Sequence, residues 1–294
     1  MTPRRGAWTA AIVCLALAAA GCTADGDAPA PASPAPPASS QTSPPESLRG
    51  DVTGPGQFRP GLPATVDLPA GAPSAVVVLV PGGGWSSADP TGLAPLAASL
   101  VEAGLAVVTI TYGTSGSQEF YPLPADDVAC GVAFAAAQVP GVPVVLLGHS
   151  AGAHLAALVG LQPTREEDTG CPSPPHEADG VVGLAGPYDV SRTGGLAWNL
   201  FGADLEDAPD LWTEGNPLEQ ADRRTDVPFL LVHGDADRVV PVRFTTDLAQ
   251  ALSAAGHAVQ VEVLAGVDHS TVYAPEVVTG LVTAWAAAAV AAAP

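Results

Sequence analysis

The chain has 294 residues and a net charge of −20, with 30 acidic side chains against 10 basic ones, all of them arginine. A chain this acidic, without a basic cluster, does not hold a phosphate backbone by charge, which argues against nucleic-acid binding. The 47% share of hydrophobic residues excludes disorder throughout, and the 32 glycines and 31 prolines follow no period, which excludes collagen-like and coiled-coil chains.

The N-terminus carries the features of an export signal. An arginine pair at positions 4 and 5 precedes the apolar stretch Ala7–Ala20, which is too short to cross a bilayer comfortably. The stretch ends in Ala-Ala-Gly-Cys, which resembles a bacterial lipobox, whose cysteine is lipidated and becomes the new N-terminus. We therefore expect residues 1–21 to be a lipoprotein signal peptide and Cys22 to anchor the exported protein to the outer face of the bacterial cell membrane. The alternative is an ordinary cleaved signal and a secreted protein, with Sec or twin-arginine export left open.

A linker is expected over residues 22–50. The stretch Pro29–Pro45 contains only Pro, Ala, Ser, Thr and Gln, a composition that cannot bury a core and favours extended polyproline II geometry. It suits a stalk between a membrane anchor and a folded part, and equally a generic disordered tail. Residues 51–294 are then predicted to form one folded domain.

The predicted domain alternates short apolar strands with helices. Strands that are apolar on both faces and alternate with helices predict a largely parallel sheet covered by helices, an α/β fold. In chain order the predicted strands are Ala64–Leu68 at an antiparallel edge, Ala75–Val80, Leu105–Thr111, Val142–Leu147, Gly180–Ala185, Phe229–Val232 and Ala258–Leu264, and the predicted helices are residues 91–103, Asp126–Gln138, Ala151–Leu161, Thr245–Ala255 and Leu281–Pro294.

Two stretches depart from this alternation. Gln162–Asp179 is acidic and proline-rich, which indicates a surface loop. Gly186–Val227 holds Trp198, Phe201 and Trp212 among polar residues. A connection of this length either covers a pocket as a lid or forms a helical excursion that packs its own aromatic side chains.

Cysteine usage agrees with export. After removal of the signal peptide and lipidation of Cys22, two cysteines remain, Cys130 and Cys171. An even pair in an oxidising compartment predicts a disulfide. Two separately buried thiols are the alternative.

The motif Gly-His-Ser-Ala-Gly at residues 148–152 lies between a predicted strand and a predicted helix. A nucleophile at such a turn needs small neighbours, because the turn is strained and the side chain must project freely. The start of the helix also offers a dipole that favours developing negative charge. Ser150 is therefore the predicted nucleophile, and a structural turn is the alternative.

A serine hydroxyl is a poor nucleophile without a base, and the base needs an acid that fixes its tautomer. Among six histidines, His269 follows the last predicted strand, at the end of the sheet where it can face Ser150. Asp237, on the loop after the preceding strand, is the predicted acid, with Asp235 in reserve. His257, on a helix-to-strand connection, is expected at the surface.

Backbone donors for a negatively charged oxygen are expected in the loop Pro81–Trp85, which follows a buried strand. Gly83 and Gly84 leave their amides unobstructed, and Ala151 adds a third. A flexible turn is the alternative, and the absence of lysine disfavours a phosphate-binding loop.

A metal centre is not expected. His233, Asp235, Asp237 and His269 match no compact ligand spacing. No cofactor is predicted either.

Together these motifs resemble the α/β-hydrolase superfamily, and more narrowly the small carboxylesterases of the bacterial esterase/lipase and arylformamidase-like group. The resemblance implies an α/β-hydrolase fold, a mostly parallel central sheet flanked by helices, with Ser150 as nucleophile, Asp237 as acid and His269 as base in the family's chain order. Pro81 stands where the family usually has histidine, so the hydrogen bonds of that histidine are missing. The resemblance spans residues 75–282 and rests on segments 81–85, 111–112, 124–127, 148–152, 186–189, 216–218, 233–241 and 266–269.

The resulting prediction is a serine hydrolase that cleaves carboxylic esters of small molecules through an acyl-enzyme. Trp85 and Tyr112 are expected to bind the substrate, with Trp198 and Tyr273 as further pocket residues. Two alternatives are an amidase or peptidase of the same fold and a catalytically idle lipoprotein that binds at the cell surface. The net charge disfavours polyanionic substrates.

Overall fold

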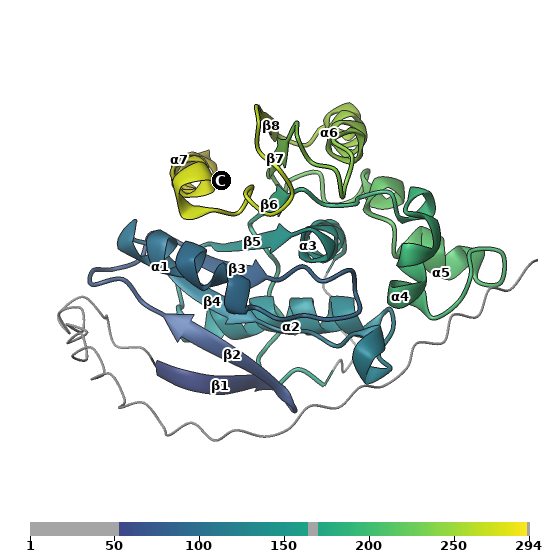
Figure 1. Ribbon diagram of the computed structural model, residues 1–294. Helices are drawn as coiled ribbons and strands as arrows, with labels where there is room; N and C mark the ends of the chain where they lie inside the picture. The colour runs from purple at the N-terminus through teal and green to yellow at the C-terminus, as the bar shows by residue number, and fades with distance from the viewer. Residues whose placement is uncertain (1–52, 164–169, 293–294) are drawn as a thin grey trace, which may run out of the picture. The chain divides into compact units, whose positions relative to one another are not determined.

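The computed structural model describes residues 53–163 and 170–292. The predicted signal peptide, the linker and Cys22 lie outside the described residues. Within the described part, eight strands form one sheet in the order β1-β2-β4-β3-β5-β6-β7-β8 (Figure 1). Their bounds are β1 Thr53–Arg59, β2 Leu62–Asp67, β3 Val76–Val80, β4 Ala106–Ile110, β5 Val144–His149, β6 Gly180–Leu184, β7 Phe229–Gly234 and β8 Val259–Leu264.

The sheet is antiparallel at one edge and parallel elsewhere. β1 pairs antiparallel with β2, and β2 with β4, whereas the six strands from β4 to β8 run parallel. Every residue of β3, β4, β5, β6 and β7 is buried, as their continuous apolar sequences predicted. The predicted α/β sheet with an antiparallel edge is confirmed.

Helices cover both faces of the sheet. One apolar cluster joins α1 and α7 to alternate strand residues, and the other joins α2, α3 and α6 to the opposite face. Parallel strands require such helical crossovers, which bury both faces of the sheet. The helices span α1 Ala94–Glu102, α2 Leu123–Gln138, α3 Ala151–Leu161, α6 Arg243–Ala255 and α7 Pro275–Ala292.

Several boundaries differ from the sequence prediction. β1 was not predicted, because Thr53–Arg59 contains Gly and Pro and no apolar alternation. α2 starts three residues before the predicted Asp126, with Pro122 at its N-cap and Pro124 at its second position. Proline is tolerated there because the first amides of a helix have no partner inside the helix. α7 starts at Pro275, one and a half turns before the apolar run that predicted it.

The long connection 186–227 is an excursion of short helices that include α4 (Trp198–Phe201) and α5 (Pro209–Glu214). It packs its own aromatics, since the rings of Phe201 and Trp212 stack at 4.5 Å. It also contacts the loop Pro81–Trp85, called the glycine loop from here on, because Asn199 Nδ2 donates to the Gly84 carbonyl at 3.1 Å. The excursion therefore packs its own aromatic side chains, as one of the two interpretations predicted, and it also contacts the loop that was expected to hold an oxyanion.

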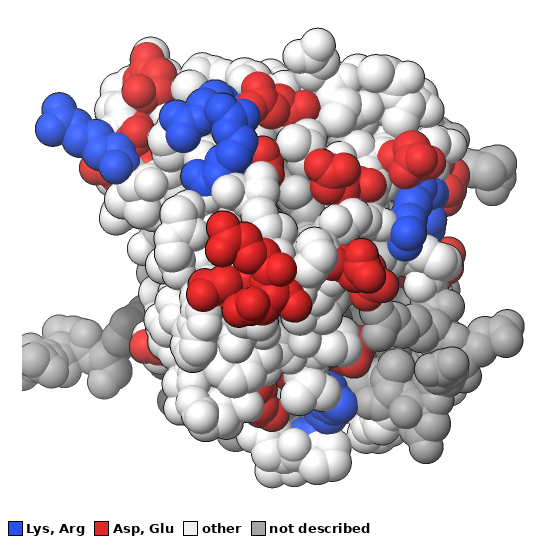
Figure 2. All heavy atoms as spheres, turned by 90° about the vertical axis from the view of Figure 1, so that its right-hand side faces the viewer, with Lys and Arg blue, Asp and Glu red and all other residues white. Residues whose placement is uncertain are grey.

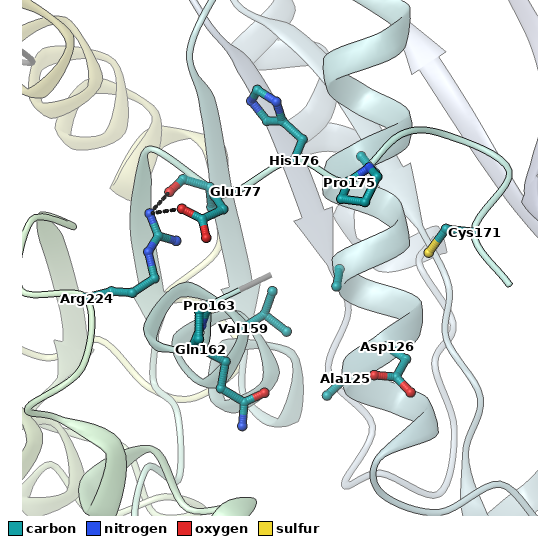
Figure 3. Close-up of a pocket in the computed structure, with 13 residues that line it drawn as sticks. Ala125, Asp126, Val159, Gln162, Pro163, Cys171, Pro175, His176, Glu177 and Arg224 are labelled. Carbon is teal, nitrogen blue, oxygen red and sulfur yellow. Dashed lines mark hydrogen bonds and ion pairs between the residues drawn. The ribbon is translucent and has the colours of Figure 1, made fainter. Parts of the chain in front are cut away.

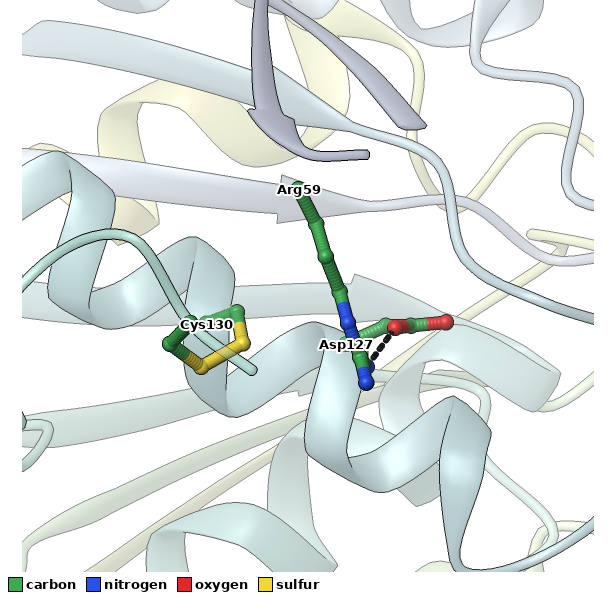
Figure 4. The surroundings of a disulfide bond; sticks show 4 residues. Arg59, Asp127 and Cys130 are labelled. Carbon is green, nitrogen blue, oxygen red and sulfur yellow. Dashed lines mark hydrogen bonds and ion pairs between the residues drawn. A yellow bond between two sulfur atoms is a disulfide. The ribbon is translucent and has the colours of Figure 1, made fainter. Parts of the chain in front are cut away.

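The outer face of α2 ties two distant segments to the domain (Figure 4). Cys130 on this helix forms a disulfide with Cys171, 41 residues later in the chain. One turn earlier, the Asp127 carboxylate pairs with the Arg59 guanidinium of β1 and accepts the Gly113 amide at 2.8 Å. The helix thus fastens the N-terminal hairpin and the loop before β6 at neighbouring positions.

Loss of the disulfide is expected to destabilise the folded protein. The Cys130→Ser variant is expected to lose about 2–4 kcal/mol of unfolding free energy, because the cross-link restricts the unfolded chain. Urea denaturation of oxidised, reduced and Cys130→Ser protein measures the effect. Equal stability of all three forms, or two free thiols found by mass spectrometry in protein purified without reductant, would contradict the expectation.

The surface retains the acidic character of the sequence. On the face that lies over α4 and α5, acidic side chains outnumber basic ones and form several groups (Figure 2). This field repels polyanions. Among the helices of the described residues, none combines the length and apolar character that crossing a membrane requires.

Candidate active site

Ser150 occupies a tight turn between β5 and α3. Its backbone is strained, with φ 55° and ψ −121°, a conformation that side-chain-bearing residues rarely adopt. Cβ atoms at Gly148 or Gly152 would overlap the backbone, of Gly152 in the first case and of Val80 and Pro81 in the second. Both glycines of the motif are therefore dictated by the turn, and the turn presents the serine hydroxyl above the sheet.

His269 lies on the loop between β8 and α7 and faces this serine. Its Nε2 lies 3.0 Å from Ser150 Oγ, although 119 residues separate the two in sequence. The other ring nitrogen, Nδ1, lies 2.7 Å from Asp237 Oδ2. Both contacts are within hydrogen-bond reach, so a proton can pass from the serine hydroxyl to the imidazole.

Asp237 lies on the loop after β7, and its carboxylate is fully buried. Oδ1 accepts the amides of Val239 and Val240 at 2.8 and 2.9 Å, and Oδ2 accepts from His269. Burial alone would raise the pKa of the Asp237 carboxyl, but these hydrogen bonds outweigh it and hold the pKa below its ordinary value. The group is therefore an anion at neutral pH and can stabilise a charged imidazole.

A second histidine, His233, lies behind this carboxylate and was not among the predicted catalytic residues. Its Nε2 lies 2.8 Å from the Val240 carbonyl and 3.3 Å from Asp237 Oδ2, while Nδ1 lies 2.7 Å from Thr245 Oγ1. A carbonyl only accepts, so Nε2 carries the proton, and Nδ1 accepts from the threonine. The ring is completely buried and supports the loop that holds Asp237. Its place at the end of β7, four residues before the acid, is the one signal that could have found it.

The remaining candidates have other positions. Asp235 is exposed, and its Oδ1 accepts the Gly266 amide at 2.7 Å, so it joins the two loops without reaching the imidazole. His257, expected at the surface, is buried, with its ring nitrogens 2.8 and 3.0 Å from the carbonyls of Val227 and Ala221. The surface prediction was wrong because the end of the excursion covers this connection.

A cleft of about 580 Å³ opens over the serine. Gly83, Gly84 and Ala151, the three expected oxyanion donors, line it together with Ser150 and His269. Ala151 is the first residue of α3, where an amide has no partner inside the helix. All three residues therefore border the cleft above the serine, which is where stabilisation of a tetrahedral intermediate needs backbone donors.

Tyr112 and Trp85, the expected substrate-binding residues, are both buried, and of the two only Trp85 lines the cleft. Tyr112 is 3% exposed, and its hydroxyl donates to the Pro81 carbonyl at 3.0 Å, so the expectation is wrong for this residue. It fastens the glycine loop at the position where the resembled family has histidine. Trp85 lines the cleft, but its indole is completely buried and packs edge-on against His154 at 5.1 Å. Leu196 and Val239 are the exposed apolar side chains that line the cleft instead.

A smaller cavity of about 60 Å³ lies beside α2 and α3, where Arg224 pairs with Glu177 at 3.2 Å (Figure 3). Among its described lining residues are Cys171, which is in the disulfide, and His176. No serine or threonine lines it within the described parts of the chain. It therefore lacks a nucleophile for acyl transfer, and the cleft at Ser150 is the candidate active site.

Two buried histidines predict a loss of stability in acid. Burial lowers the pKa of His149 and of His154 from 6.5 to about 4. Between these two pKa values the unfolded chain binds protons that the folded chain does not. The free energy of unfolding therefore decreases as the pH is lowered, by up to about 1.4 kcal/mol per pH unit for each histidine. Urea midpoints between pH 7 and pH 4.5 measure the slope, and His154→Gln is expected to reduce it. A midpoint independent of pH in this window would contradict the prediction.

The chain is similar to a known protein family and to curated proteins. The model of the BD-FAE family matches residues 66–252. The chain is 29% identical to the esterase LipC of Mycobacterium tuberculosis over 209 residues, 64% of this chain and 50% of LipC, so it spans about half the length of the curated relatives it matches.

Solved structures show the α/β-hydrolase fold that the sequence motifs implied. A truncated carbohydrate esterase from gut microbiota superposes with a TM-score of 0.71 at 20% identity, covering 84% of this chain and 99% of that one. The thermophilic esterase Est2 of the Planctomycetes species Thermogutta terrifontis superposes with a TM-score of 0.63 at 22% identity, covering 83% and 92%.

Proposed function

The chain belongs to the BD-FAE family of α/β-hydrolase-like esterases, and on this premise we propose that it is a serine carboxylesterase. Its substrates are carboxylic esters of small molecules, in keeping with relatives that are named esterases. The single observation that carries the proposal is the hydrogen-bonded series from Ser150 Oγ through His269 to Asp237, with steps of 3.0 and 2.7 Å.

The reaction follows from this geometry. Ser150 Oγ attacks the ester carbonyl carbon while His269 Nε2 takes the hydroxyl proton, and the Asp237 carboxylate stabilises the imidazolium through Nδ1–H. The backbone amides of Gly83, Gly84 and Ala151 donate hydrogen bonds to the carbonyl oxygen as it becomes negatively charged. The C–O bond to the alcohol then breaks, and His269 returns the proton to the leaving oxygen.

Water completes the cycle. His269 removes a proton from a water molecule, the resulting hydroxide attacks the acyl-enzyme, and Ser150 leaves with the proton that the imidazole returns. The products are the free acid and the alcohol. A cleft of about 580 Å³ has the volume of an ordinary small-molecule pocket and is lined by Leu196 and Val239 at its apolar side.

A comparison of bond types tests the proposal. p-Nitrophenyl esters of acetate, butyrate and octanoate are assayed beside the matching p-nitroanilides. We expect ester hydrolysis that saturates with substrate and is at least about 100-fold faster than anilide hydrolysis, and the ester series reports the acyl-chain preference. Equal or faster anilide cleavage would support the amidase or peptidase alternative and reject this assignment.

We also propose that the mature protein is exported and lipid-anchored through Cys22, or secreted if cleavage takes another position. The support is the lipobox-like end of the apolar N-terminal stretch. Mass spectrometry of the mature N-terminus from membrane fractions tests this. A native protein that keeps residues 1–21 would reject both forms of the proposal.

A further inference from the structure

His149, the residue before the nucleophile, contacts the loop that carries the base. Its Nε2 lies 2.9 Å from the backbone carbonyl oxygen of His269. Its ring also packs against two rings of that loop, with centroid distances of 4.8 Å to His269 and 4.6 Å to Tyr273. One side chain of the nucleophile turn thus holds both the backbone and the ring of the base.

The direction of this hydrogen bond is fixed by chemistry. A carbonyl oxygen only accepts, so His149 Nε2 carries a proton and donates. Burial lowers the pKa of His149 to about 4, so at neutral pH the ring is uncharged and holds this single tautomer. A neutral donor makes the contact without placing a second positive charge beside the imidazolium that forms during the reaction.

Just before His269, this loop is tied to the loop after β7, because the Gly266 amide donates to Asp235 Oδ1 at 2.7 Å and the Ala236 amide donates to the Val267 carbonyl at 3.1 Å. Asp268 accepts the amides of Ser270 and Thr271, and the Val272 amide donates to the Asp268 carbonyl, so these bonds stay inside the loop. From Asp268 to Ala274, the hydrogen bonds among the described residues reach another element only through the His269 ring and the His149 contact, besides the continuation into α7. The buried Val272 side chain adds an apolar anchor.

We propose that His149 is a positioning residue, whose Nε2–H holds the His269 backbone at the distance from Ser150 that proton transfer requires. The inference rests on the proposed esterase function. It does not make His149 a catalytic residue, because the proposed role is exerted through the His269 backbone. Displacement of a catalytic group by about 1 Å costs on the order of 100-fold in rate, so loss of this donor slows the chemical step rather than substrate binding.

Two variants of matched length test the role. In His149→Gln, the amide Nε2 is the same number of bonds from Cα as the imidazole Nε2 and can donate to His269. In His149→Met, the side chain has similar reach but no donor. We expect His149→Met to lower kcat by roughly 10- to 100-fold with KM within about threefold, and His149→Gln to stay within about fivefold of the unchanged enzyme. The rate of covalent labelling by a fluorophosphonate should fall in the same proportion as kcat/KM.

The outcomes separate the two proposals. An unchanged enzyme that neither hydrolyses esters nor reacts with the probe defeats the proposed function itself. With an active enzyme, equal activity of the Met and Gln variants, or a change confined to KM, overturns the positioning role. If thermal melting shows that the Met variant alone is unfolded, the hydrogen bond serves stability. That result would also overturn the positioning role.

Discussion

Replacement of Ser150 by alanine is expected to lower kcat/KM for p-nitrophenyl esters by about 10⁴- to 10⁶-fold. The variant keeps the Cβ atom and the turn between β5 and α3 but has no oxygen to form an acyl-enzyme. The oxyanion amides and the cleft remain, so a small residual rate above that of water is expected. Thermal melting of both proteins checks that the fold survives.

Ser270→Ala is the matched control for this loss. Ser270 is exposed and follows His269 directly, and its backbone amide, which the substitution retains, donates to Asp268. Its activity is expected within about threefold of the unchanged enzyme, as for surface substitutions in general. A folded Ser150→Ala variant with undiminished ester hydrolysis would reject the assignment of the nucleophile.

Replacement of Asp237 by asparagine is expected to lower kcat by about 10³- to 10⁴-fold. The Asp237 carboxylate accepts at 2.7 Å from His269 Nδ1 and thereby keeps the proton off Nε2, the nitrogen that must accept from Ser150. An amide at this position can donate to Nδ1 instead, which favours the wrong tautomer, and it removes the negative charge that stabilises the imidazolium.

Asp235→Asn provides the comparison, because Asp235 was the reserve candidate for the same role. Its Oδ1 accepts the Gly266 amide, a contact that asparagine retains, and its side chain is exposed. Activity within about fivefold of the unchanged enzyme is expected. If kcat falls further in Asp235→Asn than in Asp237→Asn, Asp235 and not Asp237 is the acid that orients His269. Steady-state kinetics at constant pH measure both variants.

The sequence predicted the parts of the site that follow from local pattern. The glycines at 148 and 152 indicate a turn too tight for side chains, and the strand before Ser150 indicates where that turn lies. The positions of Asp237 and His269 after successive parallel strands indicate that all three side chains reach one edge of the sheet. The strands of the central sheet were predictable for the same reason, since burial on both faces leaves continuous apolar runs.

The features that the sequence could not indicate depend on packing between residues far apart in the chain. An aromatic residue near a glycine loop has no sequence signal that separates a substrate contact from a support, and Tyr112 is buried beneath Pro81. The contact of His149 joins residues 120 positions apart, and that of Asn199 with Gly84 joins residues 115 apart. β1 lacks the apolar alternation by which strands are recognised, and it is held by pairing with β2 and by the Arg59–Asp127 ion pair.

The most direct measurement of the central claim is covalent labelling by paraoxon, followed by intact-mass analysis and peptide mapping. Nucleophilic attack by an activated serine transfers the diethylphosphoryl group to its oxygen and releases p-nitrophenol. We predict one such group per chain, located on Ser150, with loss of ester hydrolysis in proportion to labelling, no adduct in Ser150→Ala and much slower labelling in His269→Ala. An enzyme that hydrolyses esters at full rate while Ser150 stays unlabelled, or one labelled on another residue as activity is lost, would contradict the account.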